Sequence, residues 1–102
     1  MAVSPGVCIR FAKTGDMKFI SHLDLMRLFQ RALRRAGIPV EITKGFSPHP
    51  RISIEPAIKL GLESRDLKAS FKLDNWVEPS LLKDRLQGKL PSGIELLEVR
   101  IQ

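Results

Sequence analysis

Four arginines recur at helical spacing between residues 27 and 35 and form the densest cluster of like charge in the chain. Arg27, Arg31, Arg34 and Arg35 fall at positions i, i+4, i+7 and i+8, which places them on one face of a helix. Asp24 can pair with Arg27 only. Planar guanidinium groups bind phosphate through paired hydrogen bonds, so the row suits a nucleic-acid backbone. A solvated helix face and an acidic protein partner are the alternative interpretations.

The segment KGFSPHPR, residues 44–51, is a second candidate for chemistry. Lys44, His49 and Arg51 supply charge and hydrogen bonds, and Phe46 supplies a ring on which an unpaired base could stack. Gly45 permits a close approach of the backbone. Cations interleaved with an aromatic residue are typical of a single-stranded RNA site. Alternatively, Phe46 anchors the loop in the core and His49 has a surface or structural role.

The two histidines, His22 and His49, are the catalytic candidates of the chain. His22 lies at the start of the predicted helix, where anions are attracted. A neutral imidazole at His22 or His49 could act as the general base of a metal-independent ribonuclease. A zinc site built from Cys8, His22 and His49 lacks the short ligand spacings of known sites. We therefore expect no metal and no cofactor.

Charge and composition agree with an anionic partner. The chain has 102 residues and a net charge of +6, and all of the excess lies in residues 1–51. This asymmetry favours nucleic acid as the partner. A hydrophobic content of 43% fits one soluble domain over residues 1–102. With no apolar run of membrane length and no signal peptide, we expect a cytoplasmic location and no membrane partner.

Alternation and turn residues predict the elements that position these side chains. We expect strands at residues 7–11, 40–43, 67–73 and 94–101, and another within residues 52–62 that Pro56 interrupts. Helices are predicted at residues 22–36, with Ser21 as N-cap, and from Pro79 to about residue 90. The slip in alternation at Leu96 and Leu97 indicates a β-bulge.

This order of elements predicts an α+β fold. It matches a ferredoxin-like, split β-α-β sandwich, in which two helices cover one face of an antiparallel sheet. The other face would be left open or partnered. The strand edges near residues 52–62 could pair with a second copy, and the oligomeric state is left open.

Five strings, in order, are FAKTGD (residues 11–16), SHLDLMR (21–27), RRAGIP (34–39), GFSPHPRIS (45–53) and PAIKLGLES (56–64). Over residues 7–64 the chain resembles the DUF2344 family of radical-SAM-linked bacterial proteins. That resemblance implies a domain that stands alone or follows a radical SAM enzyme module. It also implies genes near those of ribosomal proteins and an RNA-processing nuclease, and no assigned activity.

The chain departs from the family in two respects. Relatives are usually longer, so this chain would be a short member or the N-terminal half of one. The family continues after Glu63-Ser64 with an acidic residue and a tyrosine, whereas this chain has Arg65 and no tyrosine. The cysteine triad of a radical SAM cluster cannot come from Cys8 alone.

We expect an RNA-binding accessory module in RNA modification or processing, with no catalysis of its own, and a radical SAM enzyme as its partner. The alternative is a module that docks onto that enzyme, and a ribonuclease comes third. The candidate nucleic-acid-binding residues are Lys13, Arg27, Arg31, Arg34, Arg35, Lys44, Phe46, His49 and Arg51.

Overall fold

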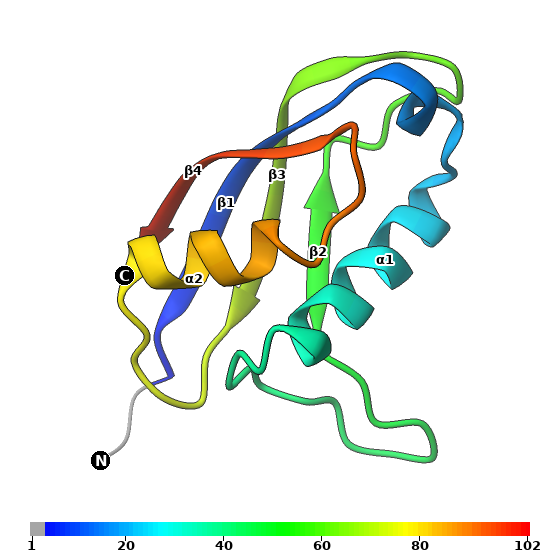
Figure 1. Cartoon of the computed structure of the whole chain (residues 1–102). Helices are drawn as coiled ribbons and strands as arrows, with labels where there is room; N and C mark the ends of the chain where they lie inside the picture. The colour runs from blue at the N-terminus through cyan, green and yellow to red at the C-terminus, as the bar shows by residue number, and fades with distance from the viewer. Residues whose placement is uncertain (1–3) are drawn as a thin grey trace.

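The fold is a four-stranded antiparallel sheet with two α-helices on one face, and the computed structural model describes residues 4–102 (Figure 1). The elements are β1 (Gly6–Lys13), the 3-10 helix η1 (Gly15–Phe19), α1 (His22–Arg35), β2 (Ile52–Glu55), β3 (Ser64–Lys72), α2 (Pro79–Gln87) and β4 (Ile94–Ile101). The strand order is β2-β3-β1-β4. Each β-α-β unit therefore has a strand of the other unit between its own two strands. The α+β prediction is confirmed.

A single hydrophobic core lies between the sheet and the helices. Val7, Ile9 and Phe11 alternate along β1 and are buried, whereas Cys8 and Arg10 between them face the other side of the sheet. The Phe11 and Phe29 rings pack with their centroids 4.8 Å apart, which joins β1 to α1. Leu82 and Leu86 bring α2 onto the same core.

Helix α1 begins and ends as its sequence predicts. The Ser21 hydroxyl accepts a hydrogen bond from the Asp24 amide at 3.1 Å, which satisfies one of the free N–H groups of the first turn. Gly37, at a φ of 68°, takes the left-handed conformation that ends the helix. Leu25, Phe29 and Leu33 are buried, so the opposite face of α1 is turned to solvent.

The strand predicted at residues 40–43 is wrong. Only isolated bridges form there, between Val40 and Leu73 and between Ile42 and Pro50. The pairing of Ile42 with Pro50 stops after one bridge because the neighbouring amides bind elsewhere: the Glu41 amide donates to the Lys72 carbonyl, and the His49 amide donates to the Thr43 hydroxyl. Strand β2 ends at Glu55 because Pro56 follows, and residues 56–63 are irregular.

Three further features of the structure can be compared with the predictions from the sequence. The 3-10 helix η1 was not predicted from the sequence. Helix α2 ends at Gln87 rather than near residue 90, with Gly88 as its C-cap. The bulge predicted in β4 is confirmed, since Arg10 pairs with Glu98 and Phe11 with Leu96, which leaves Leu97 unpaired.

Within residues 4–102, no helix is long and apolar enough to cross a membrane.

Candidate functional site

The arginine row (Arg27, Arg31, Arg34 and Arg35) lies on the solvent face of α1, as predicted. All four residues are exposed. Arg27 forms the expected exposed ion pair with Asp24 at 3.6 Å, so part of its charge is already neutralised. Such an exposed pair contributes at most about 1 kcal/mol to stability. Arg31 and Arg35, one turn apart on this face, form no ion pair with any described residue.

Residues 43–50 form a narrow projecting finger. The Thr43 amide donates to the His49 carbonyl at 2.8 Å, and the Arg51 amide donates to the Glu41 carbonyl at 3.2 Å. These bonds join the two sides of the finger near its base. Its tip carries Lys44, Gly45 and Phe46, all exposed. Gly45 has a φ of 135°, which a residue with a side chain rarely adopts.

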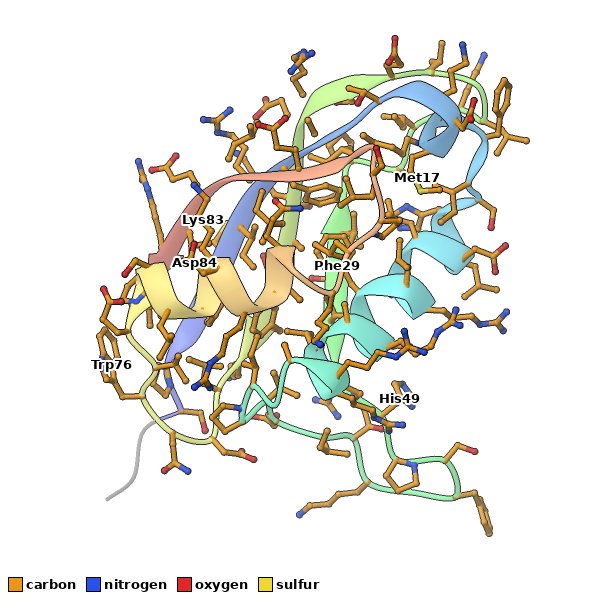
Figure 2. The ribbon with its side chains drawn as sticks, viewed as in Figure 1. Met17, Phe29, His49, Trp76, Lys83 and Asp84 are labelled. Atoms are coloured by element: carbon orange, nitrogen blue, oxygen red, sulfur yellow. The ribbon has the colours of Figure 1, made fainter. Side chains whose placement is uncertain are left out.

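Two hydrogen bonds tie this finger to α1. The Arg34 guanidinium donates to the Pro48 carbonyl, and the Gln30 side-chain amide donates to the Pro50 carbonyl at 3.3 Å. Figure 2 accordingly shows His49 beside the C-terminal end of α1. The fold thus brings together the arginine row and the KGFSPHPR segment, although nothing in their spacing along the chain required it.

Phe46 stands free at the tip of the finger. Its exposed fraction is 107%, as large as in an extended peptide. The interpretation in which Phe46 anchors the loop in the core therefore does not hold. Burying a phenylalanine side chain stabilises a folded protein by about 1.5–3 kcal/mol. Because the Phe46 ring is exposed, the free domain lacks this stabilisation. The ring remains available to a ligand.

The His49 ring is oriented by the finger. Its Nδ1 lies 2.7 Å from the Ser47 carbonyl oxygen, which can only accept, so Nδ1 carries the proton. The His49 amide donates to the Thr43 hydroxyl at 3.2 Å. In the neutral ring this leaves the lone pair on Nε2, which can accept a hydrogen bond.

His22 does not join this group. It is the first residue of α1, and the twelve residues from it to Arg34 span about 18 Å of helix. The two histidines of the ribonuclease hypothesis therefore lie at opposite ends of α1. Across residues 4–102, no group of three His, Cys, Asp or Glu side chains is placed to hold a metal ion.

Lys13 and Arg51 also lie outside the group formed by the arginine row and the finger. Lys13 is 2% exposed, and this burial lowers the pKa of its amine. The residue is paired with Ser64 and Ile94 at the end of β1, so it does not extend the arginine row. Arg51, just before β2, lines a cavity on the helix-free face of the sheet.

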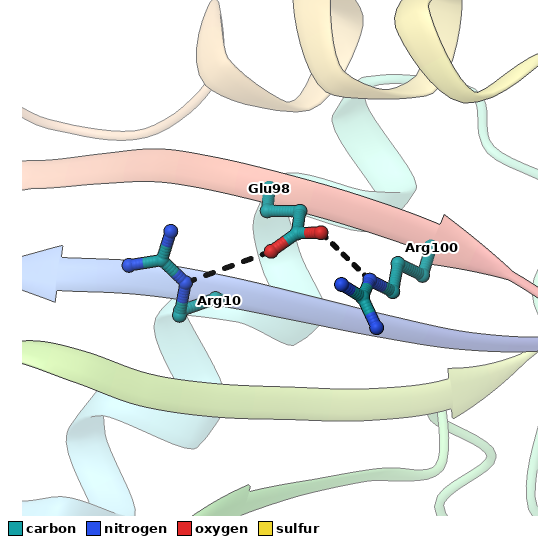
Figure 3. Close-up of polar contacts among 3 residues, drawn as sticks. All are labelled: Arg10, Glu98 and Arg100. Atoms are coloured by element: carbon teal, nitrogen blue, oxygen red, sulfur yellow. Dashed lines mark hydrogen bonds and ion pairs between the residues drawn. The ribbon is translucent and has the colours of Figure 1, made fainter.

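The sequence analysis did not identify that open face of the sheet as a site. Arg10 on β1 and Arg100 on β4 flank Glu98, with Nε–Oε distances of 3.7 and 2.6 Å (Figure 3). The hydrogen bond and charge of Arg100, reinforced by Arg10, lower the pKa of Glu98. The Glu98 carboxylate offsets one of the two positive charges, so the group keeps a net charge of +1. Alternation along β1 and β4 could have predicted that Arg10, Glu98 and Arg100 lie on this face. It could not have predicted the cavity on the same face.

A second surface was also missed and lies at the other end of α1. Here the Gly15 amide donates to a Glu63 carboxylate oxygen at 2.8 Å, and the Gly61 amide donates to the Lys18 carbonyl at 2.7 Å. These bonds bring η1 beside residues 56–63, as Figure 1 shows. We define the apolar end as the large side chains on these segments and the first turn of α1, each more than half exposed: Phe19, Leu23, Leu60 and Leu62.

Comparison with known proteins identifies the family. Residues 7–102 match the family described as "Uncharacterized protein conserved in bacteria (DUF2344)". The chain belongs to the DUF2344 family. Membership thus covers β1 to β4, well beyond residues 7–64, where the quoted strings lie. No curated protein and no solved structure matches this DUF2344 domain.

Proposed function

We propose that this DUF2344 domain binds single-stranded RNA at the surface formed by the arginine row and the finger. The observation that carries the proposal is the free Phe46 ring on a projection fixed beside four exposed guanidinium groups. Stacking of a base on an aromatic ring contributes about 1–3 kcal/mol and tolerates any base. Phosphates of the same strand would contact the arginines.

Single strands suit this surface better than duplexes. In a duplex the bases are already stacked on each other, so Phe46 would find no free base face. The domain would act as a non-catalytic accessory module in RNA modification or processing. A radical SAM enzyme would supply the chemistry, a partnership that rests on the family resemblance alone.

Fluorescence anisotropy with labelled single-stranded and duplex RNA tests the proposal. We expect log Kd to rise with log salt at a slope of about 2–3, because each phosphate contact on a single strand contributes about 0.7. Duplex RNA should bind more weakly. Absence of binding at low salt, or tighter binding of the duplex, would contradict the proposal.

Matched variants locate the site. Arg31→Ala/Arg35→Ala removes two charges from the row and keeps the bond from Arg34 to the finger, so the salt slope should fall by about 1.4. The control Arg85→Ala/Lys89→Ala removes two charges at and just beyond the end of α2 and should leave the slope unchanged. An equal fall in the salt slope for both double variants would mean that RNA binding depends only on the net charge of the domain.

A second candidate function is docking onto a partner protein through the apolar end. Soluble monomers rarely expose large contiguous apolar patches, and interface centres are rich in Phe and Leu. We propose the radical SAM enzyme of the same bacterium as the partner. Calorimetric titration of that enzyme should lose its signal with Phe19→Ser/Leu62→Ser and keep it with Arg31→Ala/Arg35→Ala. The reverse pattern would contradict docking at this end.

A further inference from the structure

The open face of the sheet contains a cavity of about 540 Å³. Its floor is made of short residues that are neighbours across three strands, since Cys8 pairs with Ser70 and Ser70 pairs with Ser53. Gly6, two residues before Cys8, adds no side chain at all. The next row of the same face carries Glu55, Lys68, Arg10 and Glu98, which have longer side chains.

The rim of the cavity is polar and charged. Arg51 and Lys72 bring positive charge, and Glu41 and Gln102 bring hydrogen-bonding groups. Within the described residues, neither Arg51 nor Lys72 belongs to an ion pair, in contrast to Arg10 and Arg100 elsewhere on the same face of the sheet, which share Glu98 (Figure 3). These two cations are free to meet an anion.

The finger rises from this rim. Glu41 and Arg51, which line the cavity, are the two residues joined by a backbone hydrogen bond at the base of the finger. The Glu41 amide also donates to the Lys72 carbonyl at 2.8 Å, which fixes the finger base to β3. From Glu41 on the rim to Phe46 the chain spans at most about 17 Å, so one bound strand can reach both the ring and the cavity.

We propose that this cavity binds one nucleotide, with its phosphate at Arg51 and Lys72 and its base over the floor formed by Gly6 and Cys8. The volume lies within the range of small-molecule sites, about 300–1,000 Å³. The Glu41 carboxylate can accept from amino groups on a base edge, and the Ser53 and Ser70 hydroxyls can donate or accept. The inference extends the proposed RNA site. The nucleotide is either part of the bound strand or free in solution.

Cys8 makes the cavity directly measurable. It is the only cysteine of the chain, and its side chain is partly exposed on the floor. Alkylation of its thiol by the neutral reagent iodoacetamide, followed by mass spectrometry, reports whether the floor is covered. An oligonucleotide at ten times its Kd should slow alkylation about tenfold, because about one tenth of the sites remain empty. Cys8→Ser gives the blank.

Parallel arms separate this inference from the proposed function. Binding of the oligonucleotide by anisotropy, without protection of Cys8, would overturn the nucleotide cavity and leave the RNA site standing. Protection by mononucleotides without binding of the strand would support the cavity and count against the RNA function. Neither binding nor protection would overturn both. Protection of Cys8 by the bound oligonucleotide supports both the cavity and the RNA site, whether or not mononucleotides also protect it.

A variant provides an independent check. Ser70→Trp fills the floor from a position that faces away from the core, so the fold should be kept. We expect it to weaken oligonucleotide binding about tenfold if the base occupies the hollow, because the indole would occupy the space that the base needs. The control Lys83→Trp on α2 should bind as the wild type does. Unchanged affinity with Ser70→Trp would overturn the inference.

Discussion

The segments beside the two ends of α1 are held in place by different hydrogen bonds. At the C-terminal end, the finger is held to the helix by side-chain bonds from Gln30 and Arg34 to backbone carbonyls. At the N-terminal end, η1 and residues 56–63 are joined through backbone amides of Gly15 and Gly61. Figure 2 shows the separation, with Met17 of η1 at one end of the helix and His49 at the other.

The difference separates stability from binding. Thr14 donates its amide to the Gly93 carbonyl at 2.9 Å, so the apolar end is tied into the turn before β4 and belongs to the folded framework. The finger buries little, and its exposed charges and ring add little to the stability of the free domain. Substitutions in the turn that ties the apolar end to the framework should therefore act on unfolding, whereas substitutions in the finger should act on ligand affinity.

The largest effect is expected from Gly93→Ala. Gly93 has a φ of 95°, and a Cβ there would lie 2.6 Å from the Thr14 carbonyl oxygen and 2.8 Å from Met17 Cγ. Strain and overpacking together should lower the free energy of unfolding by about 3 kcal/mol, measured by urea denaturation. RNA affinity of the folded protein should be kept.

Gly88→Ala is the matched control for Gly93→Ala. Gly88 has helical dihedrals at the end of α2, and its Cβ would meet only ordinary contacts of 3.5 and 3.6 Å. The substitution should be neutral or stabilise by up to about 1 kcal/mol, because alanine restricts the unfolded chain. Equal destabilisation by both variants would show that the packing around Gly93 is not special.

Phe46→Ala should reverse the pattern. Because the ring contacts solvent, unfolding should change by less than about 0.5 kcal/mol. Binding of single-stranded RNA should weaken by about 1–3 kcal/mol through the lost stacking. Anisotropy and urea denaturation on one preparation check both halves, and Phe46→Trp should retain the affinity. Loss of stability without loss of affinity would break the comparison.

A smaller effect distinguishes members of the arginine row. Arg31→Ala should reduce the salt slope of RNA binding by about 0.7, whereas Arg27→Ala should reduce it less, because Asp24 already shares the charge of Arg27. Asp24→Asn should accordingly tighten binding. Salt titrations of the three variants decide the matter, and identical slopes for both arginine variants would show that the ion pair does not persist in solution.

The smallest effect is expected from Phe19→Ser/Leu62→Ser. Both side chains are largely exposed, so the unfolding free energy should shift by no more than about 0.5 kcal/mol. RNA affinity should change less than about twofold, since sites this far apart act independently. A marked loss of RNA binding would place the RNA on the apolar end and reverse the assignment of the two ends.

The periodic parts of the fold could be predicted from the sequence. Ser21, Asp24 and Gly37 mark the ends of α1, and alternation marks β1, β3 and β4, because both signals act between residues close in the chain. The α+β class followed from their order. The strand at residues 40–43 failed because its apolar residues, Val40 and Ile42, find only single bridging partners.

The candidate residues of the site could be predicted from the sequence, but their arrangement in space could not. Spacing placed the arginines on one face, and the two prolines indicated a loop. The bonds from Arg34 and Gln30 to that loop join segments that are 14 and 20 residues apart, so no local pattern reports them. The exposed Phe46 and the cavity over Gly6 and Cys8 also depend on how strands β1, β2 and β3 lie together.

The position of β1 has a consequence for folding during synthesis. β1 is made first, yet it pairs with β3 on one side and with β4 on the other, and the Gln102 amide donates to the Gly6 carbonyl at 2.8 Å. Until β4 leaves the ribosome, Val7, Ile9 and Phe11 lack part of their cover, and one side of β1 has unpaired backbone groups. Closing the sheet requires contacts across almost the whole domain, which slows folding. The nascent domain therefore passes through a period in which a central strand is open to pairing with other chains.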